Sequence, residues 1–203
     1  TLVGWIWTPY DPLDMNPDVS FARPSFSHIL GTDVFGRDVL SNIMIGARST
    51  LIVALVSVFI GIALGAAIGI SAALSPAKVR QLTIFGIDII LALPSVLFAI
   101  VLAAVYGAST FTATIAIGIA LSAAIAQVTR RETTQVLRSD YVAAAKVSGS
   151  GTGQIIRLHV LPNILPSLLV QASGAVAIAI LAESTLSYLG LGTTPPTPSW
   201  GRM

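Results

Sequence analysis

STLIVALVSVFIGIALGAAIGISAALSPA, residues 49–77, contains no Asp, Glu, Lys or Arg. The same holds for residues 89–129 and 158–182. A helix needs about 20 mainly apolar residues to cross the hydrocarbon layer of a membrane. The first and third intervals are therefore each long enough for one crossing. The second interval is 41 residues long, which is enough for two crossings with a break near 106–110.

The composition agrees with a membrane protein, because 54% of the residues are hydrophobic and only 10% are charged. The mean hydropathy is +0.85, well above that of ordinary soluble domains. The apolar runs are continuous and do not alternate, which favours helices over barrel strands. We therefore expect an all-α, polytopic transmembrane helical bundle with four full crossings, at 50–74, 83–106, 112–130 and 164–189.

Small residues recur at a spacing of four in the first expected crossing, at Gly61, Gly65 and Gly69. Such spacing lets two helix backbones approach closely. We interpret it as a helix–helix seam within one bundle. The less favoured alternative is a homodimer contact.

The basic residues divide unevenly between the two sides of the expected membrane. Seven of the eleven lie at one side: Lys78, Arg80, Arg130, Arg131, Arg138, Lys146 and Arg157. Because cytoplasmic loops carry the excess of Lys and Arg, the loop 131–163 is predicted to be cytoplasmic and residues 9–48 external. Because the basic residues sort by membrane side in this way, the net charge of +2 is no evidence for nucleic-acid binding.

Two regions are expected. Residues 1–48 would hold the end of a preceding membrane helix, with Trp5 and Trp7 at the interface, then an external segment and the start of an interfacial helix. Residues 49–203 would form the transmembrane domain, with the cytoplasmic loop 131–163. At least one further helix is expected beyond each end of the sequence.

The loop's second half, DYVAAAKVSGSGTGQIIRLHVLPN (140–163), predicts a short helix capped by Asp140 and ended by Gly149. A flexible turn at 150–153 and a second helical piece at 154–159 follow, and Pro162 and Pro166 open the next crossing. The small residues Ala143, Ala144 and Ala145 would let this helix fit a groove of another protein. The equally weighted alternative is a compact loop that covers its own helix ends.

The external segment 28–51 has turn-forming Gly31 and Gly36, then Asp38 as the cap of a helix with apolar residues at helical spacing. One interpretation is a surface that meets a soluble partner or the substrate. We favour the other, an interfacial helix that fixes the bundle at the membrane surface.

Three polar residues lie in or beside the expected crossings: Asp88, Glu183 and His159. A charge at bilayer depth is costly and should face the bundle interior. Glu183 would line a translocation path or form a buried pair with Ser184 or Ser187, and for Asp88 we favour a structural role. His159 is expected to be a helix-end residue, because no second ligand stands at metal-site spacing.

The sequence has no cysteine, and it lacks the phosphate-binding loop and the common hydrolase signatures. An intramembrane enzyme that uses Glu183 or Asp88 has no nucleophile–base pair to support it. A secondary transporter would be expected to show internal repeats. Neither class is favoured.

The loop resembles the EAA loop of permeases from ABC importers that work with a binding protein. Ala144, Ala145 and Gly149 match its pattern. After nine further residues come His159-Val160-Leu161-Pro162, of which Leu161 and Pro162 match. Ala143 stands where that family has Glu, and His159 stands where Ile is usual. The His-x-Leu-Pro-Asn form is similar to the peptide and nickel branch.

The external segment is similar to the second permease of dipeptide and oligopeptide importers. The matching residues are Gly31, Thr32, Asp33, Gly36, Arg37 and Asp38. Tyr10-Asp11-Pro12, the segment from Glu183 to Gly192, and Pro198-Ser199-Trp200-Gly201 resemble the same subfamily.

The resemblance implies a six-helix channel-forming subunit in the cell membrane of a bacterium or archaeon, importing dipeptides or oligopeptides, or alternatively nickel or another small solute. It implies no catalysis and no cofactor in this chain, because ATP and Mg²⁺ would be bound by partners. The implied partners are a second homologous permease, two ATPase subunits, an extracytoplasmic substrate-binding protein and membrane lipid. The loop helix, with Asp140, Tyr141 and the alanines, would insert into a cleft of one ATPase subunit.

Overall fold

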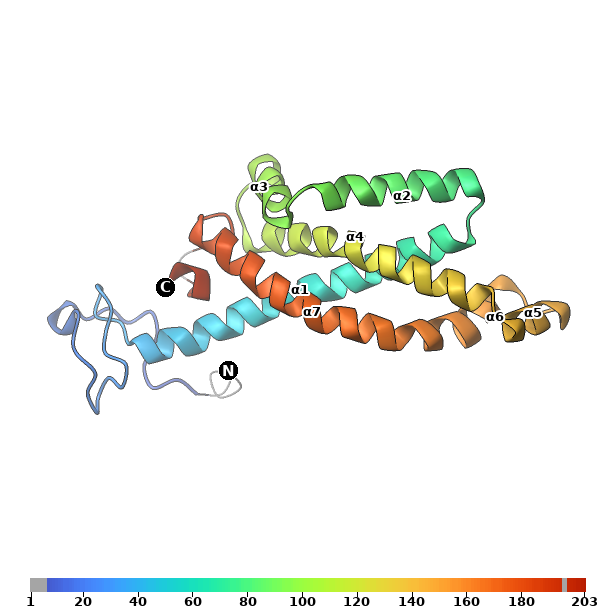
Figure 1. The fold of residues 1–203 in the computed structure, drawn as a ribbon. Coiled ribbons are helices and arrows are strands. Elements are labelled where there is room, and N and C mark those ends of the chain that lie inside the picture. Colours follow the sequence, from blue (N-terminus) through green and yellow to red (C-terminus); the bar gives the residue numbers. More distant parts are fainter. Residues whose placement is uncertain (1–6, 195–196) are drawn as a thin grey trace.

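The computed structural model describes residues 7–194 and 197–203, and within them the regular structure is helical. The long helices are α1 (Val39–Leu74), α4 (Thr110–Leu137) and α7 (Leu161–Tyr188), with α2 (Ala77–Ala92) and α3 (Ser95–Tyr106) between the first two. Figure 1 shows α1, α2, α4 and α7 running side by side as an elongated bundle. The predicted fold class, an all-α transmembrane bundle, is confirmed. The expected helix end around Trp5 lies outside the described residues.

Helix α1 begins much earlier than the predicted crossing at 50–74. Asp38 caps it, as predicted, because its carboxylate accepts a hydrogen bond from the Ser41 amide at 2.8 Å. The helix then runs without a break for 36 residues, about 54 Å at 1.5 Å per residue. The predicted interfacial helix is therefore the first part of the continuous helix α1, and the expected region boundary at residue 48 lies inside it.

The glycines of α1 form the seam with α4, as the sequence predicts. A methyl group on Gly65 would lie 2.7 Å from the Ser122 carbonyl oxygen and 2.8 Å from the Ile125 Cβ. Gly118 of α4 meets Ile60 of α1 equally closely, and the Ser57 hydroxyl donates to the Thr114 carbonyl at 2.9 Å across the same seam. The glycines thus let two backbones touch within one chain.

The predicted helix over 83–106 is interrupted. Helix α2 ends at Ala92, α3 starts at Ser95, and the two axes are bent by 91°. Proline disfavours the helical conformation of the residue before it, and Leu93 is extended, with φ −93° and ψ 129°. Pro94 therefore ends α2 and redirects the chain.

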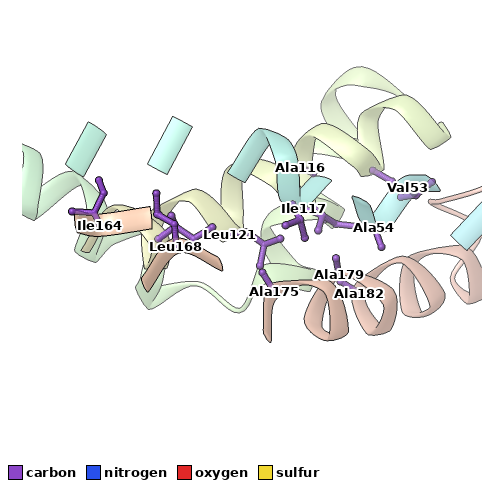
Figure 2. Packing of buried hydrophobic residues seen from close by; sticks show 14 of the residues in the cluster. Val53, Ala54, Ala116, Ile117, Leu121, Ile164, Leu168, Ala175, Ala179 and Ala182 are labelled. Carbon is purple, nitrogen blue, oxygen red and sulfur yellow. The ribbon is translucent and has the colours of Figure 1, made fainter. Parts of the chain in front are cut away.

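Helix α4 lies at the centre, since 61% of its most apolar stretch is buried, against 33% for α1 and 22% for the last long helix. Figure 2 shows that buried side chains of α4 pack between those of α1 and α7. The residues are Ile117 and Leu121 of α4, Val53 and Ala54 of α1, and Ala175, Ala179 and Ala182 of α7. Among the described residues, three helices are long and apolar enough to cross a membrane, and they contain the expected crossings at 50–74, 112–130 and 164–189. The expected crossing at 83–106 falls on the bent α2–α3 pair, which makes a fourth span only if the two helices are taken together.

The C-terminal segment folds back onto the first part of α1. The short helix η4 (Trp200–Arg202) follows Ser199, and the Trp200 indole donates to the Ile43 carbonyl at 3.2 Å. The Ser49 hydroxyl donates to the Pro198 carbonyl at 2.6 Å. Two segments about 150 residues apart in sequence therefore close this end of the structure together.

Candidate functional site: the polar loop between α4 and α7

The loop is built around helix α5 (Asp140–Val147), which begins directly after α4 ends. Ser139, with φ −75° and ψ 151°, is the N-cap, and its carbonyl accepts from the Ala143 amide at 3.1 Å. The prediction that Asp140 is the cap is wrong by one residue. Asp140 lies in the first turn and Lys146 in the last, which places each charge favourably in the helix dipole.

One side chain fixes α5 to the bundle. Val142 is fully buried and belongs to the main core with Ile155, Val160 and Ile164. The opposite face is open to solvent: Tyr141 is 47% exposed and Val147 91% exposed, with Ala143 and Ala144 exposed between them. Helix α5 therefore presents a short apolar ridge of small residues away from its own chain.

Gly149 ends the helix as predicted. It has φ +85°, its amide donates to the Lys146 carbonyl, and the Ser150 amide donates to the Ala145 carbonyl, each at 3.0 Å. This pair of bonds is the Schellman arrangement, which places its C′ residue in the left-handed region that favours glycine. Nothing lies within 4 Å of the site where a Cβ would stand, so backbone conformation alone selects glycine here.

The chain then enters the membrane as one long helix. Helix α6 (Thr152–Ile155) passes into the π turn η3 (Ile156–Val160) and then into α7. The predicted separate piece at 154–159 is part of this 37-residue run from Thr152 to Tyr188. Pro162 lacks an amide hydrogen and its ring crowds the carbonyl four residues earlier, which accounts for a widened turn just before it. The Leu161 amide accordingly bonds five residues back, to Ile156.

The two halves of the loop meet through an aromatic contact. The rings of Tyr141 on α5 and His159 in η3 lie 5.7 Å apart with an interplanar angle of 47°. The Asn163 side-chain amide donates to the His159 carbonyl at 2.6 Å, which supports the π turn from the other side. Of the predicted loop residues, Tyr141 and His159 thus come together, whereas Ala143 and Ala144 face outward.

Glu183 is fully buried at the external end of α7. Its Oε1 accepts hydrogen bonds from the Ser187 hydroxyl at 2.7 Å and the Thr193 hydroxyl at 3.0 Å. The predicted partner Ser187 is therefore correct. Thr193 was not identified from the sequence, because only the turn after α7 brings it back to Glu183. The Glu183 Oε2 is buried and has no hydrogen-bond partner among the described residues.

Asp88 differs from the prediction that intramembrane charges face the bundle interior. It is exposed on the outer side of α2, whereas its neighbour Ile87 faces the core at 5% exposure. No hydrogen bond or ion pair to its carboxylate is present within residues 7–194 and 197–203. The structure therefore gives it no packing role inside this chain.

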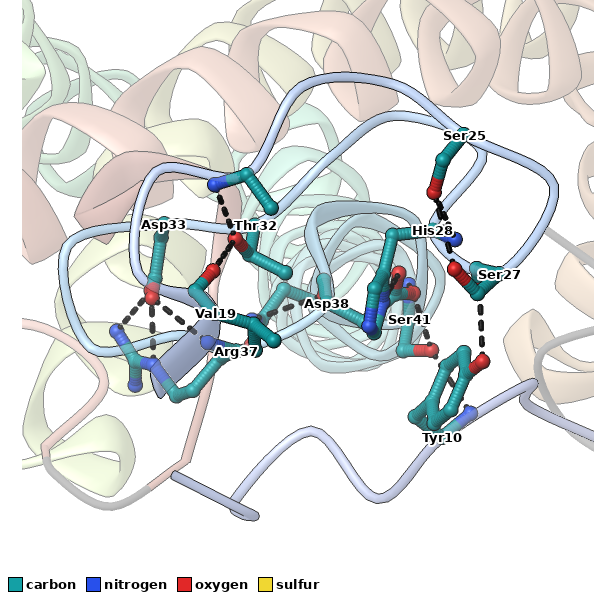
Figure 3. Close-up of polar contacts among 12 residues, drawn as sticks. Tyr10, Val19, Ser25, Ser27, His28, Thr32, Asp33, Arg37, Asp38 and Ser41 are labelled. Atoms are coloured by element: carbon teal, nitrogen blue, oxygen red, sulfur yellow. Dashed lines mark hydrogen bonds and ion pairs between the residues drawn. The ribbon is translucent and has the colours of Figure 1, made fainter. Parts of the chain in front are cut away.

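The predicted external motif forms a self-contained fold over the start of α1 (Figure 3). Gly31 and Gly36 both have positive φ, at 76° and 72°, as expected of turns. Arg37 Nε and one terminal nitrogen each lie 2.8 Å from Asp33 Oδ2. Burial raises the pKa of Asp33, but its hydrogen bonds from Arg37 and the Phe35 amide outweigh this, so the pKa lies below its usual value.

Asp38 is the centre of this segment. Its Oδ2 accepts from the Ser41 hydroxyl at 2.7 Å, and its Oδ1 lies 3.0 Å from His28 Nδ1. Burial raises the pKa of Asp38, but the hydrogen bonds from the Ser41 amide and hydroxyl and from His28 outweigh it and lower the pKa. The Tyr10 amide in turn donates to the Ser41 hydroxyl at 3.1 Å. The sequence indicated the cap but not His28 or Tyr10, whose positions depend on the loop.

The comparisons with known proteins agree with this arrangement. Residues 61–203 match the family described as "Binding-protein-dependent transport system inner membrane component". The chain belongs to this family. By the family's description, it is an inner membrane component of a transport system that depends on a binding protein. With its long apolar helices, it is a multi-pass membrane protein.

Similar curated members of the family are transport permeases. The chain is 39% identical over 205 residues to the di/tripeptide transport system permease protein DppC of Pseudomonas aeruginosa, covering 98% of this chain and 67% of that protein. It is 38% identical over 206 residues to the dipeptide transport system permease protein DppC of Escherichia coli, covering 98% and 68%. A putative peptide permease protein of Brucella suis is 35% identical, over 98% and 66%. The chain thus spans about two thirds of the length of these relatives.

A solved structure shows the same fold. The inward-facing MetNI methionine ABC transporter matches with a TM-score of 0.66 over 73% of this chain and 74% of that chain, at 19% sequence identity. At this identity the likeness extends to the helical fold and not to the substrate. The helical architecture described above is therefore shared with a chain of that transporter.

Proposed function

We propose that this chain is the channel-forming permease subunit of an ATP-driven importer of dipeptides or oligopeptides in the bacterial cytoplasmic membrane. The observation that carries the proposal is the exposed ridge of α5, held firmly to the bundle by buried Val142. The relatives named as di/tripeptide and dipeptide permeases support the substrate class. The nickel alternative has no comparable support among these observations.

In this proposal, α5 inserts into a cleft of an ATPase subunit, and the ATPase binds the ATP and Mg²⁺. The exposed small side chains at Ala143 and Ala144 allow close approach, and Tyr141 and Val147 supply apolar area. Because a loop helix lacking Glu at position 143 still has this surface, docking does not require the usual acidic residue. A second related permease and a second ATPase would complete the assembly.

Movement of the ATPase would reach the membrane through two contacts. Val142 belongs to the same buried cluster as Ile155 and Val160, and the Tyr141 ring lies 5.7 Å from the His159 ring. Both contacts lead into the continuous helix from Thr152 to Tyr188. A displacement of α5 would therefore shift that helix and exchange two arrangements of the bundle.

The test is purification of the tagged complete transporter from native membranes, followed by reconstitution with its binding protein. ATPase subunits should co-purify, and Ala144→Arg should abolish that association and peptide uptake without preventing membrane insertion. Gln135→Arg, which places the same charge on the exposed surface of neighbouring α4, is the matched control. Normal ATP-dependent uptake by the Ala144→Arg variant would disprove docking through α5.

A further inference from the structure

The outer face of α2 carries a stripe with three polar side chains, which runs from the first turn of the helix into the crossing predicted to begin at residue 83. Lys78, Gln81, Phe85 and Asp88 follow one another at spacings of three, four and three residues, so they share one helix face. All four are exposed, and this face borders an open groove of about 630 Å³. The groove is also lined by Leu82 and Ile84.

Asp88 lies deep along this helix. It stands eleven residues after Ala77, where α2 begins, which corresponds to about 16 Å of axial rise. The crossing predicted from the sequence begins at residue 83, so Asp88 lies five residues, about 8 Å, inside it if α2 runs along the membrane normal. Figure 1 shows α2 alongside α4 and antiparallel to it, along the long axis of the bundle.

The exposed face of α1 provides a contrast at comparable depth. Between residues 49 and 70 its exposed side chains are all apolar: Ile52, Leu55, Val56, Phe59, Ala63, Leu64 and Ala67. That face suits lipid. A carboxylate in contact with lipid chains is strongly unfavourable, so the α2 face must meet water or a polar partner.

The polarity of the stripe is confined to one side of Pro94. Beyond it, the exposed residues Leu97, Val101 and Val105 of α3 are apolar. The polar part therefore extends from the Lys78 end, predicted to be cytoplasmic, to Asp88 and then stops.

We infer that the α2 face from Lys78 to Asp88 lines the aqueous substrate pathway, and that the Asp88 carboxylate binds the N-terminal ammonium group of a passing peptide. A carboxylate without a partner in the described chain complements a cationic amine, and every unblocked peptide carries one. The identity of this ligand rests on the proposed peptide import. The inference that water reaches this face of α2 does not rest on peptide import.

The absence of cysteine from the sequence allows a direct test of the face. Phe85→Cys and Phe59→Cys place one thiol each on the α2 stripe and on the α1 apolar face, at residues 65% and 72% exposed. In the reconstituted transporter, a charged, membrane-impermeant methanethiosulfonate reagent should modify the Phe85→Cys variant much faster, and saturating dipeptide should slow this reaction. Equal, slow modification of the two variants would show that lipid or another subunit covers α2, and would overturn the inference.

The role of the carboxylate is tested by transport. Asp88→Asn should reduce dipeptide uptake by roughly tenfold, as for the loss of one charge-assisted hydrogen bond, and Asp88→Glu should restore most of it. Peptide affinity of the separate binding protein should be unchanged. Normal uptake by Asp88→Asn, together with a reactive Phe85→Cys variant, would overturn amine binding while leaving the water-lined face. Failure of the unmodified transporter to import peptide would refute the proposed function, whereas the thiol reaction would still decide the face.

Discussion

The ring of Tyr141 on α5 lies 5.7 Å from the ring of His159 in the π turn, so helix α5 contacts the start of the last long helical run through these two side chains. We expect Tyr141→Ala to loosen α5 and to lower the peptide imported per ATP hydrolysed by a few-fold. Tyr141→Phe keeps the ring and should behave as the unmodified protein. The measurement is the ratio of uptake to hydrolysis in proteoliposomes, and equal ratios for the two variants would show that the ring contact is unimportant.

Gly149 should tolerate alanine poorly for a reason of backbone conformation alone. A non-glycine residue with φ near +85° costs about 1–2 kcal/mol. Gly151→Ala is the matched control, since Gly151 has φ −71° and equally open surroundings. Protease cleavage within 148–153 should increase for Gly149→Ala only. Identical cleavage of both variants would contradict the helix ending described for α5.

Gly65 lies in the seam between α1 and α4, and Gly174 on α7 offers a matched control. Gly65→Ala should destabilise the chain by about 1–3 kcal/mol, because its methyl group would press on the Ser122 carbonyl and Ile125. Gly174→Ala on α7 meets nothing within 4 Å and should be neutral or slightly stabilising. The midpoint of thermal unfolding in detergent measures both. A Gly65→Ala variant as stable as the parent would show that the two helices separate without cost.

Glu183 should be replaceable by Gln but not by Ala. Glu183→Gln keeps a carbonyl that accepts from Ser187 and Thr193, whereas Glu183→Ala leaves two buried hydroxyls without their acceptor. Each such loss costs about 1–3 kcal/mol. Unfolding midpoints of the two variants should therefore separate clearly. If Glu183→Gln transports normally, a role of the Glu183 charge in gating is also ruled out.

The external segment should lose stability in acid. The pKa values of Asp33 and Asp38 are lowered by folding, so both carboxylates stabilise the fold above their unfolded pKa of about 3.9. That stabilisation disappears as pH falls through the lower folded pKa values. The protection factors of residues 16–41, which correct hydrogen exchange for the intrinsic pH dependence of amide exchange, should thus be high near pH 5 and fall below about pH 4. Asp38→Asn should make the segment labile at both pH values, whereas Asp14→Asn, an exposed residue, should not.

The helical crossings were predictable because apolar length and glycine spacing are properties of a continuous stretch of chain. The bend at Leu93-Pro94 and the π turn before Pro162 were harder, since proline near a helix end either starts, kinks or ends it according to its neighbours. Distant contacts were not accessible at all. His28 with Asp38, Thr193 with Glu183 and Tyr141 with His159 depend on turns whose geometry emerges only with the fold. The exposure of Asp88 likewise required knowing which face of α2 meets α4.

Helix α1 is longer than a membrane is thick, and this sets the height of the external segment. Its first ten residues, Val39 to Arg48, precede the uncharged stretch and account for about 15 Å of helix. If α1 stands along the membrane normal, Asp38 and the turns around it are raised above the lipid surface by more than the roughly 8 Å over which physiological salt screens charge. A soluble protein that approaches the external segment is therefore shielded from lipid headgroups. Its association rate should change little when anionic lipids replace neutral ones.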